Sequence, residues 1–178
     1  MNWLNEYELP ILWWIREHLT CPFLDTVMPY ISSLARHGEF WILLALILLC
    51  FKKTRKAGVA MGLAMVCGFL VGNIGLKNIV GRIRPYDMVE VELLVKSLSD
   101  FSFPSGHTLV SIEAATALAV YHRKWGIAAL VLASLIALSR LYLFVHYPTD
   151  VVAGVIIGVG IALLCCRVTE WLWKHQEA

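Results

Sequence analysis

The chain has 178 residues, of which 59% are hydrophobic and 16% are charged, and its mean hydropathy is +0.70. This composition is too apolar for an ordinary soluble domain, so we expect a protein of the lipid bilayer. The net charge of +2 at pH 7 is too small to indicate nucleic acid as a partner.

The first 37 residues are expected to form an interfacial N-terminal segment of short helices. Charged residues interrupt every apolar run before it reaches the ~20 residues that a spanning helix requires. These charged residues are Arg16, Glu17, His18, Asp25 and Arg36. Trp13 and Trp14 carry rings suited to the headgroup region. Pro10, Pro22 and Pro29 are expected to cut the segment into separate helices.

Residues 38–178 are expected to form one membrane-embedded domain. Four stretches have about the length and apolarity of a membrane span. They are residues 57–80, 105–122, 126–145 and 149–173. A fifth stretch, residues 40–51, is shorter and spans if Lys52 and Lys53 extend to the interface. The sequence therefore predicts an all-α, polytopic bundle of about five transmembrane helices.

The distribution of Lys and Arg predicts the orientation of the bundle. Two compact basic turns, residues 51–58 and 121–126, and the basic C-terminal end are typical of the cytoplasmic side. Residues 81–104 and 144–149 then face the periplasm or the cell exterior, in a multi-pass protein of the cell (inner) membrane.

Polar side chains gather where the predicted spans begin and end on this outer side. Charged groups are costly in a bilayer unless they have partners or water, so their places carry information. They are Lys77, Arg82, Arg84, Ser105, His107, Ser139, Arg140, His146 and Asp150. Several cations and two histidines at one membrane face predict an anion-binding pocket.

The stretch GLKNIVGRIRPY places two cations on one predicted helix face. Lys77 and Arg84 are seven residues apart, which is about two helical turns, and Pro85 is expected to stop the helix directly after them. Both side chains are therefore expected to bind an anion. Arg82, between them, is expected to be a surface or lipid-headgroup contact.

The stretch PSGH opens the next predicted span. Pro104 suits a helix entry, Ser105 is a favoured N-cap, and Gly106 allows close approach to the backbone. The free N–H groups at this helix start favour a phosphate beside His107. Taken alone, the motif fits equally well an N-cap followed by an interfacial histidine.

The stretch SRLYLFVHYPTD predicts a nucleophile with its support. His146 directly precedes a helix that Pro148 is expected to start, and Asp150 can reach back to one ring nitrogen. A carboxylate there leaves the other nitrogen free to attack. Arg140 adds a forked, permanently charged donor for phosphate oxygens.

Together the three stretches resemble the signature motifs of the type-2 phosphatidic acid phosphatase superfamily, which also includes vanadium haloperoxidases. The motifs K-x6-R-P, P-S-G-H and S-R-x5-H-x3-D are complete and in order at residues 77–85, 104–107 and 139–150. The resemblance covers about residues 38–173. Bacterial members usually carry six spans, and residues 1–37 resemble the region that follows their first span. We therefore expect no counterpart of that span here, which leaves the N-terminal topology open.

The resemblance implies a lipid phosphatase that needs no metal or other cofactor. It implies that His146 attacks phosphorus while Asp150 holds its ring, and that His107 serves as general acid and base. The implied phosphate-binding residues are Lys77, Arg84, Arg140, Ser105 and Gly106. Glu113, outside the motifs, is expected to form a hydrogen bond between helices.

A phosphorylated lipid is the expected substrate, and the sequence leaves its identity and the oligomeric state open. Undecaprenyl diphosphate, phosphatidylglycerol phosphate, phosphatidic acid and diacylglycerol diphosphate all suit a site at headgroup depth. A lipid phosphotransferase would use the same residues. A haloperoxidase is disfavoured because those proteins are typically soluble. A non-enzymatic lipid carrier needs no nucleophile, which the pairing of His146 with Asp150 opposes.

Overall fold

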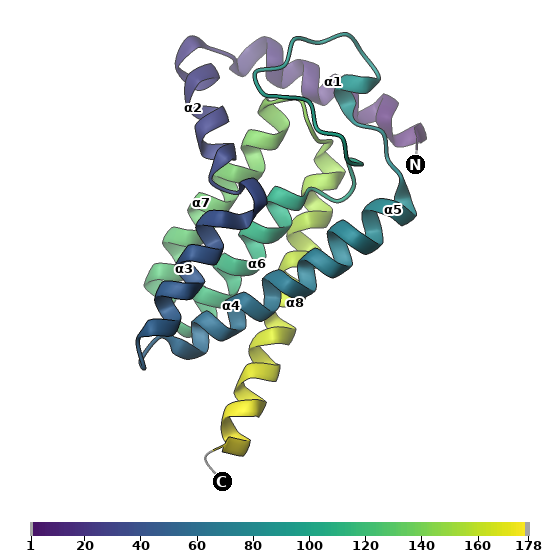
Figure 1. Ribbon diagram of the computed structural model, residues 1–178. Helices are drawn as coiled ribbons and strands as arrows, with labels where there is room; N and C mark the ends of the chain where they lie inside the picture. The colour runs from purple at the N-terminus through teal and green to yellow at the C-terminus, as the bar shows by residue number, and fades with distance from the viewer. Residues whose placement is uncertain (1, 177–178) are drawn as a thin grey trace.

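A computed structural model describes residues 2–176, and all of its regular elements there are helical, as predicted (Figure 1). In chain order they are α1 (Asn2–Leu19), α2 (Pro22–Ser33), η1 (Arg36–Gly38), α3 (Glu39–Cys50), α4 (Arg55–Gly68), the π-helix η2 (Phe69–Leu76), α5 (Lys77–Val80), η3 (Pro85–Asp87), α6 (Gly106–Tyr121), α7 (Arg123–Tyr142) and α8 (Pro148–Gln176). In Figure 1, α4, η2 and α5 form one diagonal rod.

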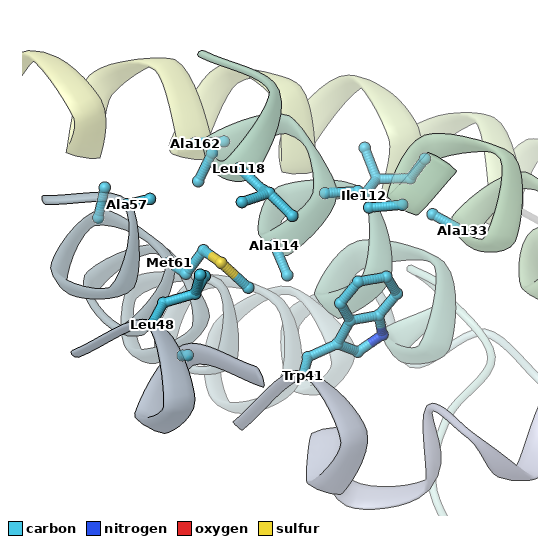
Figure 2. Packing of buried hydrophobic residues seen from close by; sticks show 14 of the residues in the cluster. Trp41, Leu48, Ala57, Met61, Ile112, Ala114, Leu118, Ala133 and Ala162 are labelled. Atoms are coloured by element: carbon cyan, nitrogen blue, oxygen red, sulfur yellow. The ribbon is translucent and has the colours of Figure 1, made fainter. Parts of the chain in front are cut away.

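Helix α6 lies at the centre of the bundle and packs against α4, α7 and α8. Small residues such as Ala114 and Ala117 are fully buried on it, which allows close helix approach. Figure 2 shows Trp41 and Met61 near Ala114, and Ala117 belongs to the same apolar core. The Trp41 indole N–H also donates to Ser111 Oγ at 3.0 Å, which links α3 to α6.

Within residues 2–176, three segments are long and apolar enough to cross a bilayer, and a bent pair is a fourth candidate. The three are Arg55–Asp87, Arg123–Tyr142 and Pro148–His175, and the pair joins Pro22–Ser33 to Arg36–Cys50 at 44°. The predicted span over α6 has only 16 helical residues. A helix of that length is about 24 Å long, short of the ~30 Å hydrocarbon core. Neighbouring helices shield α6, so it need not match the lipid thickness.

The N-terminal residues form longer helices than the positions of their prolines led us to expect. Pro10 lies inside α1 and Pro29 inside α2, while Pro22 begins α2. The expectation that Pro10 and Pro29 end helices is wrong, because an interior proline removes one hydrogen bond and bends a helix that packing can still hold. In Figure 1, α1 lies across the upper end of the bundle, whereas α2 packs on α7. The interfacial placement of residues 1–37 stays a prediction.

The tight crossing of α6 and α7 predicts a steric effect at Gly126. A Cβ added there would lie 2.0 Å from the Cα atom of Ala119. We expect Gly126→Ala to lower the melting temperature of the purified protein, because overpacking costs about 1–3 kcal/mol. Gly62→Ala on α4 is the control, since no atom lies within 4 Å of its added Cβ. Equal melting temperatures for the two variants would contradict this packing.

Candidate active site

Six of the eight predicted site residues border one cavity, at the end of the bundle where α6 and α8 begin and α7 ends. Its volume is about 960 Å³. The six are Lys77, Arg84, Gly106, His107, Arg140 and His146. Away from them the cavity continues between α3 and α4, past Leu46 and Leu49. Ser105 and Asp150 lie behind its wall and are fully buried. The cavity therefore has a charged end and an apolar extension.

Lys77 and Arg84 meet as predicted, but by a different geometry. The helix ends at Val80, because Gly81 adopts a left-handed conformation with φ +57°, and Arg84 lies on extended backbone beyond it. The prediction of one helix running to Pro85 is therefore wrong. Gly81 ends the helix earlier since it can take a positive φ without steric cost. The chain reversal still brings both cations to the same partner, Asp100.

Asp100 is an anion within the predicted phosphate seat. Its Oδ2 accepts from the Lys77 ammonium, and its Oδ1 accepts from Arg84 Nη2 at 2.6 Å. Burial opposes ionisation of this half-exposed carboxyl, but the two cations outweigh burial and lower the pKa of Asp100 to about 2. The carboxylate is therefore ionised at neutral pH and occupies the cations that a substrate phosphate would need.

His146 is held so that one ring nitrogen faces the cations. Its Nε2 lies 3.2 Å from Arg84 Nη1, and since a guanidinium only donates, Nε2 accepts and the ring proton is on Nδ1. Burial, followed by the nearby charges of Arg84 and Arg140, holds the pKa of His146 well below its usual value. A neutral imidazole with its lone pair toward an anion seat has the form that a nucleophile requires.

The predicted contact between His146 and Asp150 is present, and a second group shares it. Asp150 Oδ2 lies 3.4 Å from His146 Nδ1, beyond an ordinary hydrogen bond. Ser102 Oγ is also 3.4 Å from Nδ1, and it donates to Asp150 Oδ2 at 2.5 Å. Ser102 and Asp150 therefore support the ring together.

The PSGH segment differs from the prediction at its serine. Ser105 is the N-cap of α6 but forms no capping hydrogen bond with its side chain, which instead accepts from Thr108 at 2.9 Å. Its backbone N–H donates to the carbonyl of Asp150 at 3.1 Å. The prediction of a free N–H at Ser105 is wrong, because the start of α8 packs against it. Gly106 and His107 begin the helix and border the cavity.

Arg140 reaches the cavity from the last turn of α7. Its side chain is buried, and Nη1 donates to Ser32 Oγ on α2. Its Nε has no hydrogen-bond partner within residues 2–176. A buried guanidinium with an unused donor beside Lys77 and Arg84 suits the binding of an additional anion.

Arg82 lies far from its predicted place on the surface. Its side chain is fully buried, it donates to Asp150 Oδ1 at 2.6 Å, and it pairs with Glu8 of α1. The prediction of a lipid-headgroup contact is wrong, because two buried carboxylates compensate the buried charge. Arg82 thus belongs to the support of the site.

Glu113 forms no hydrogen bond through Oε2 in the described part of the chain, contrary to the predicted bond between helices. Its carboxyl packs against α4 at Gly68, where an added Cβ would lie 2.0 Å from Oε2. Because Gly68 has no side chain, the Glu113 carboxyl fits beside it, but Gly68 offers the carboxyl no side-chain donor. Glu113 borders the apolar extension of the cavity.

Three neighbours of the site were not predicted from the sequence: Asp100, Ser102 and Glu8. Asp100 and Ser102 lie within five residues of the PSGH segment, so their closeness to a motif was a usable signal. Glu8 had none, because it precedes Arg82 by 74 residues. Within residues 2–176, no group of three or more His, Cys, Asp or Glu side chains is placed to hold a metal ion.

The position of Asp100 predicts competition with phosphate. We expect Asp100→Asn to lower the inhibition constant of inorganic phosphate about tenfold, because the ion pairs that phosphate must displace are gone. The effect should persist from pH 5 to 9, since Asp100, with its pKa of about 2, stays ionised there. Competition assays with an aryl phosphate measure the constant. Glu90→Gln removes an exposed charge from the same loop as a control, and an unchanged constant in Asp100→Asn would contradict the prediction.

The chain is similar to membrane phosphatases over most of its length. Residues 53–174 match the sequence model of the PAP2 superfamily. An undecaprenyl-diphosphatase of Sulfolobus acidocaldarius is 33% identical over 82% of this chain and 70% of the relative. Phosphatidylglycerophosphatase B of Bacillus subtilis is 32% identical over 88% of this chain and 80% of the relative. The crystal structure of a PAP2-type phosphatidylglycerolphosphate phosphatase from Bacillus subtilis has a TM-score of 0.77 and 29% identity, covering 96% of this chain and 88% of that chain.

Proposed function

The chain belongs to the PAP2 superfamily, and on this premise we propose that it hydrolyses a lipid phosphate or diphosphate through a phosphohistidine at the outer membrane face. It is a membrane lipid phosphatase. The observation that carries the mechanism is the ring of His146, whose Nε2 accepts from Arg84 beside an anion-binding cavity. A nucleophile and its charge-stabilising donors are thereby within reach of one phosphorus atom.

In the first step, His146 Nε2 forms a bond to phosphorus and the bond to the leaving oxygen breaks. Lys77, Arg84 and Arg140 stabilise the charge on the phosphoryl oxygens, as cationic clamps do in phosphoryl transfer. His107 borders the same cavity and donates a proton to the leaving oxygen. The products of this step are the released lipid and a phosphoenzyme.

In the second step, His107 takes a proton from water, the water oxygen bonds to phosphorus, and the bond between nitrogen and phosphorus breaks. Inorganic phosphate then leaves, and His146 is again neutral. The support of Asp150 and Ser102 matters in both steps, because the ring must keep its proton on Nδ1 while Nε2 attacks phosphorus and while it carries the phosphoryl group.

The substrate is proposed to be an isoprenyl diphosphate, with glycerolipid phosphates as further substrates. The named activities of the relatives, undecaprenyl-diphosphatase and phosphatidylglycerophosphatase, support this range. The apolar extension of the cavity between α3 and α4 supports a lipid, because it offers a hydrocarbon chain contacts that a soluble phosphate ester cannot use.

Phosphate release from a panel of lipids tests the activity. The purified protein is given undecaprenyl diphosphate, undecaprenyl phosphate, phosphatidylglycerol phosphate and phosphatidic acid, each with EDTA present. We expect the highest kcat/KM for the isoprenyl diphosphate and no effect of EDTA. Transfer of the phosphoryl group to an added lipid alcohol, without release of phosphate, would identify a phosphotransferase instead.

The membrane face of the site has its own test. In a background without native cysteines, Ser97→Cys should react in whole cells with an impermeant thiol reagent, whereas Lys53→Cys and Lys124→Cys should be protected. All three positions are exposed. The basic turns at the two protected positions favour the cytoplasm. The reverse pattern would place the site in the cytoplasm and exclude outer-leaflet substrates.

A further inference from the structure

Helix α1 buries two polar side chains, Asn5 and Glu8, against the protein, while large apolar side chains on it are exposed. Asn5 and Glu8 are buried together with Leu12, whereas Ile11 and Trp14 are 47% and 53% exposed. Burying a carboxylate costs free energy unless it is paired and hydrogen-bonded. A helix that only rested on the membrane surface would not need a carboxylate on its inner face.

The partner of this inner face is Arg82, which links α1 to the start of α8. Arg82 Nε donates to Asn5 Oδ1 at 3.0 Å, and Nη2 donates to Glu8 Oε2. Its Nη1 donates to Thr149 Oγ1 at 2.7 Å and to Asp150 Oδ1 at 2.6 Å. Glu8 in turn accepts from the backbone N–H of Thr149 at 2.7 Å. One guanidinium therefore joins two buried carboxylates.

These contacts leave the two oxygens of Asp150 with separate partners. Oδ1 is bound by Arg82, while Oδ2 accepts from Ser102 at 2.5 Å and from the Tyr147 N–H at 2.9 Å. The same Oδ2 approaches His146 Nδ1. Rotation of the carboxylate away from His146 would break the bond to Arg82, so Arg82 fixes the orientation of Asp150.

Apolar contacts hold α1 on the turn that carries His146. Leu12 packs with Phe144 and Tyr147 in one buried cluster, and the rings of Trp13 and Phe144 lie 5.1 Å apart. The Arg82 guanidinium carbon lies 3.9 Å from the centre of the Tyr147 ring. Phe144 has φ 59°, a conformation that a bulky side chain adopts only where its surroundings impose it.

We propose that Arg82 and Glu8 are positioning residues for the nucleophile, so that α1 contributes to the rate of phosphoryl transfer. The inference rests on the proposed phosphohistidine function. Glu8 acts through Arg82, and Arg82 acts through Asp150 on His146. Neither residue borders the cavity that would hold the phosphate, so loss of Glu8 should lower kcat and leave phosphate affinity in place.

Glu8→Gln tests the series of contacts from Glu8 to His146, because it removes the carboxylate charge and keeps the shape of the side chain. We expect kcat to fall about 10–100-fold, as for other groups that orient a reacting side chain. The inhibition constant of inorganic phosphate should stay within about twofold, since Lys77, Arg84 and Arg140 remain. Glu6→Gln is the matched control, because Glu6 is exposed on the same helix. Arg82→Lys should recover part of the rate that Arg82→Gln loses.

A double-mutant cycle separates positioning from general stability. In an Asp150→Asn background, Glu8→Gln should have little further effect, because the group through which it acts is already altered. The same fold-loss in both backgrounds, or a loss of phosphate affinity equal to the loss of kcat, would overturn the inference. If Asp150→Asn is too slow to assay, the comparison of kcat with the inhibition constant decides. Full activity of His146→Ala would instead overturn the proposed function.

Discussion

We expect His146→Ala to lower kcat by at least about 10⁴-fold for every lipid that the wild-type protein hydrolyses. The reason is that Nε2 of His146 is the atom that would carry the phosphoryl group, and no leaving group replaces a missing nucleophile. The melting temperature should change little by comparison, because the ring lies in the turn between α7 and α8, outside the apolar core around α6. Steady-state phosphate release measures the loss.

Quenching of the wild type in alkaline detergent with labelled substrate should trap a phosphoenzyme that acid hydrolyses and that His146→Ala lacks. His175→Ala is a matched control, since this exposed histidine lies near the C-terminal end of α8, and it should behave as wild type. Turnover by folded His146→Ala at the wild-type rate would remove the phosphohistidine mechanism. The identification of the chain as a superfamily member would stand.

His107→Ala separates the two histidines by their dependence on the leaving group. General acid catalysis contributes about 10²–10⁴ in rate, and a poor leaving group needs it most. We therefore expect a large loss of phosphoenzyme formation with a lipid monophosphate, whose alkoxide is a poor leaving group. The loss should be much smaller with a diphosphate or an aryl phosphate. Rapid-quench measurement isolates this step from the attack of water, in which His107 also takes part.

Equal slowing of phosphoenzyme formation for good and poor leaving groups would assign His107 to phosphate binding instead of proton transfer. The placement of His107 permits either role, because it begins α6 and borders the cavity. His146→Ala, by contrast, should be inactive with both kinds of leaving group. The pair of variants thus distinguishes the nucleophile from the proton donor.

The convergence of Lys77 and Arg84 could be predicted, but the path of the chain between them could not. A cation inside an apolar run is costly in a bilayer unless it faces water or an anion. The sequence therefore predicted that Lys77 and Arg84 face one pocket. The end of the helix at Gly81 depends on a left-handed residue, which spacing alone does not reveal. The loop that follows then brings Asp100 to both cations. Whether a given loop carboxylate reaches a site depends on contacts that periodicity does not encode.

The sequence by itself determined that the protein is apolar and all-α and that its polar side chains gather at helix ends. It also identified His107 and His146 as candidate catalytic residues. These follow from composition and from short-range spacing, since a charge in an apolar chain is costly wherever it lies. Only the tertiary structure decided that Arg82 is buried, that Glu8 faces it across 74 residues, and that Ser102 shares the support of His146. A buried charge is stable only where distant segments bring partners to it, and those partners are set by packing.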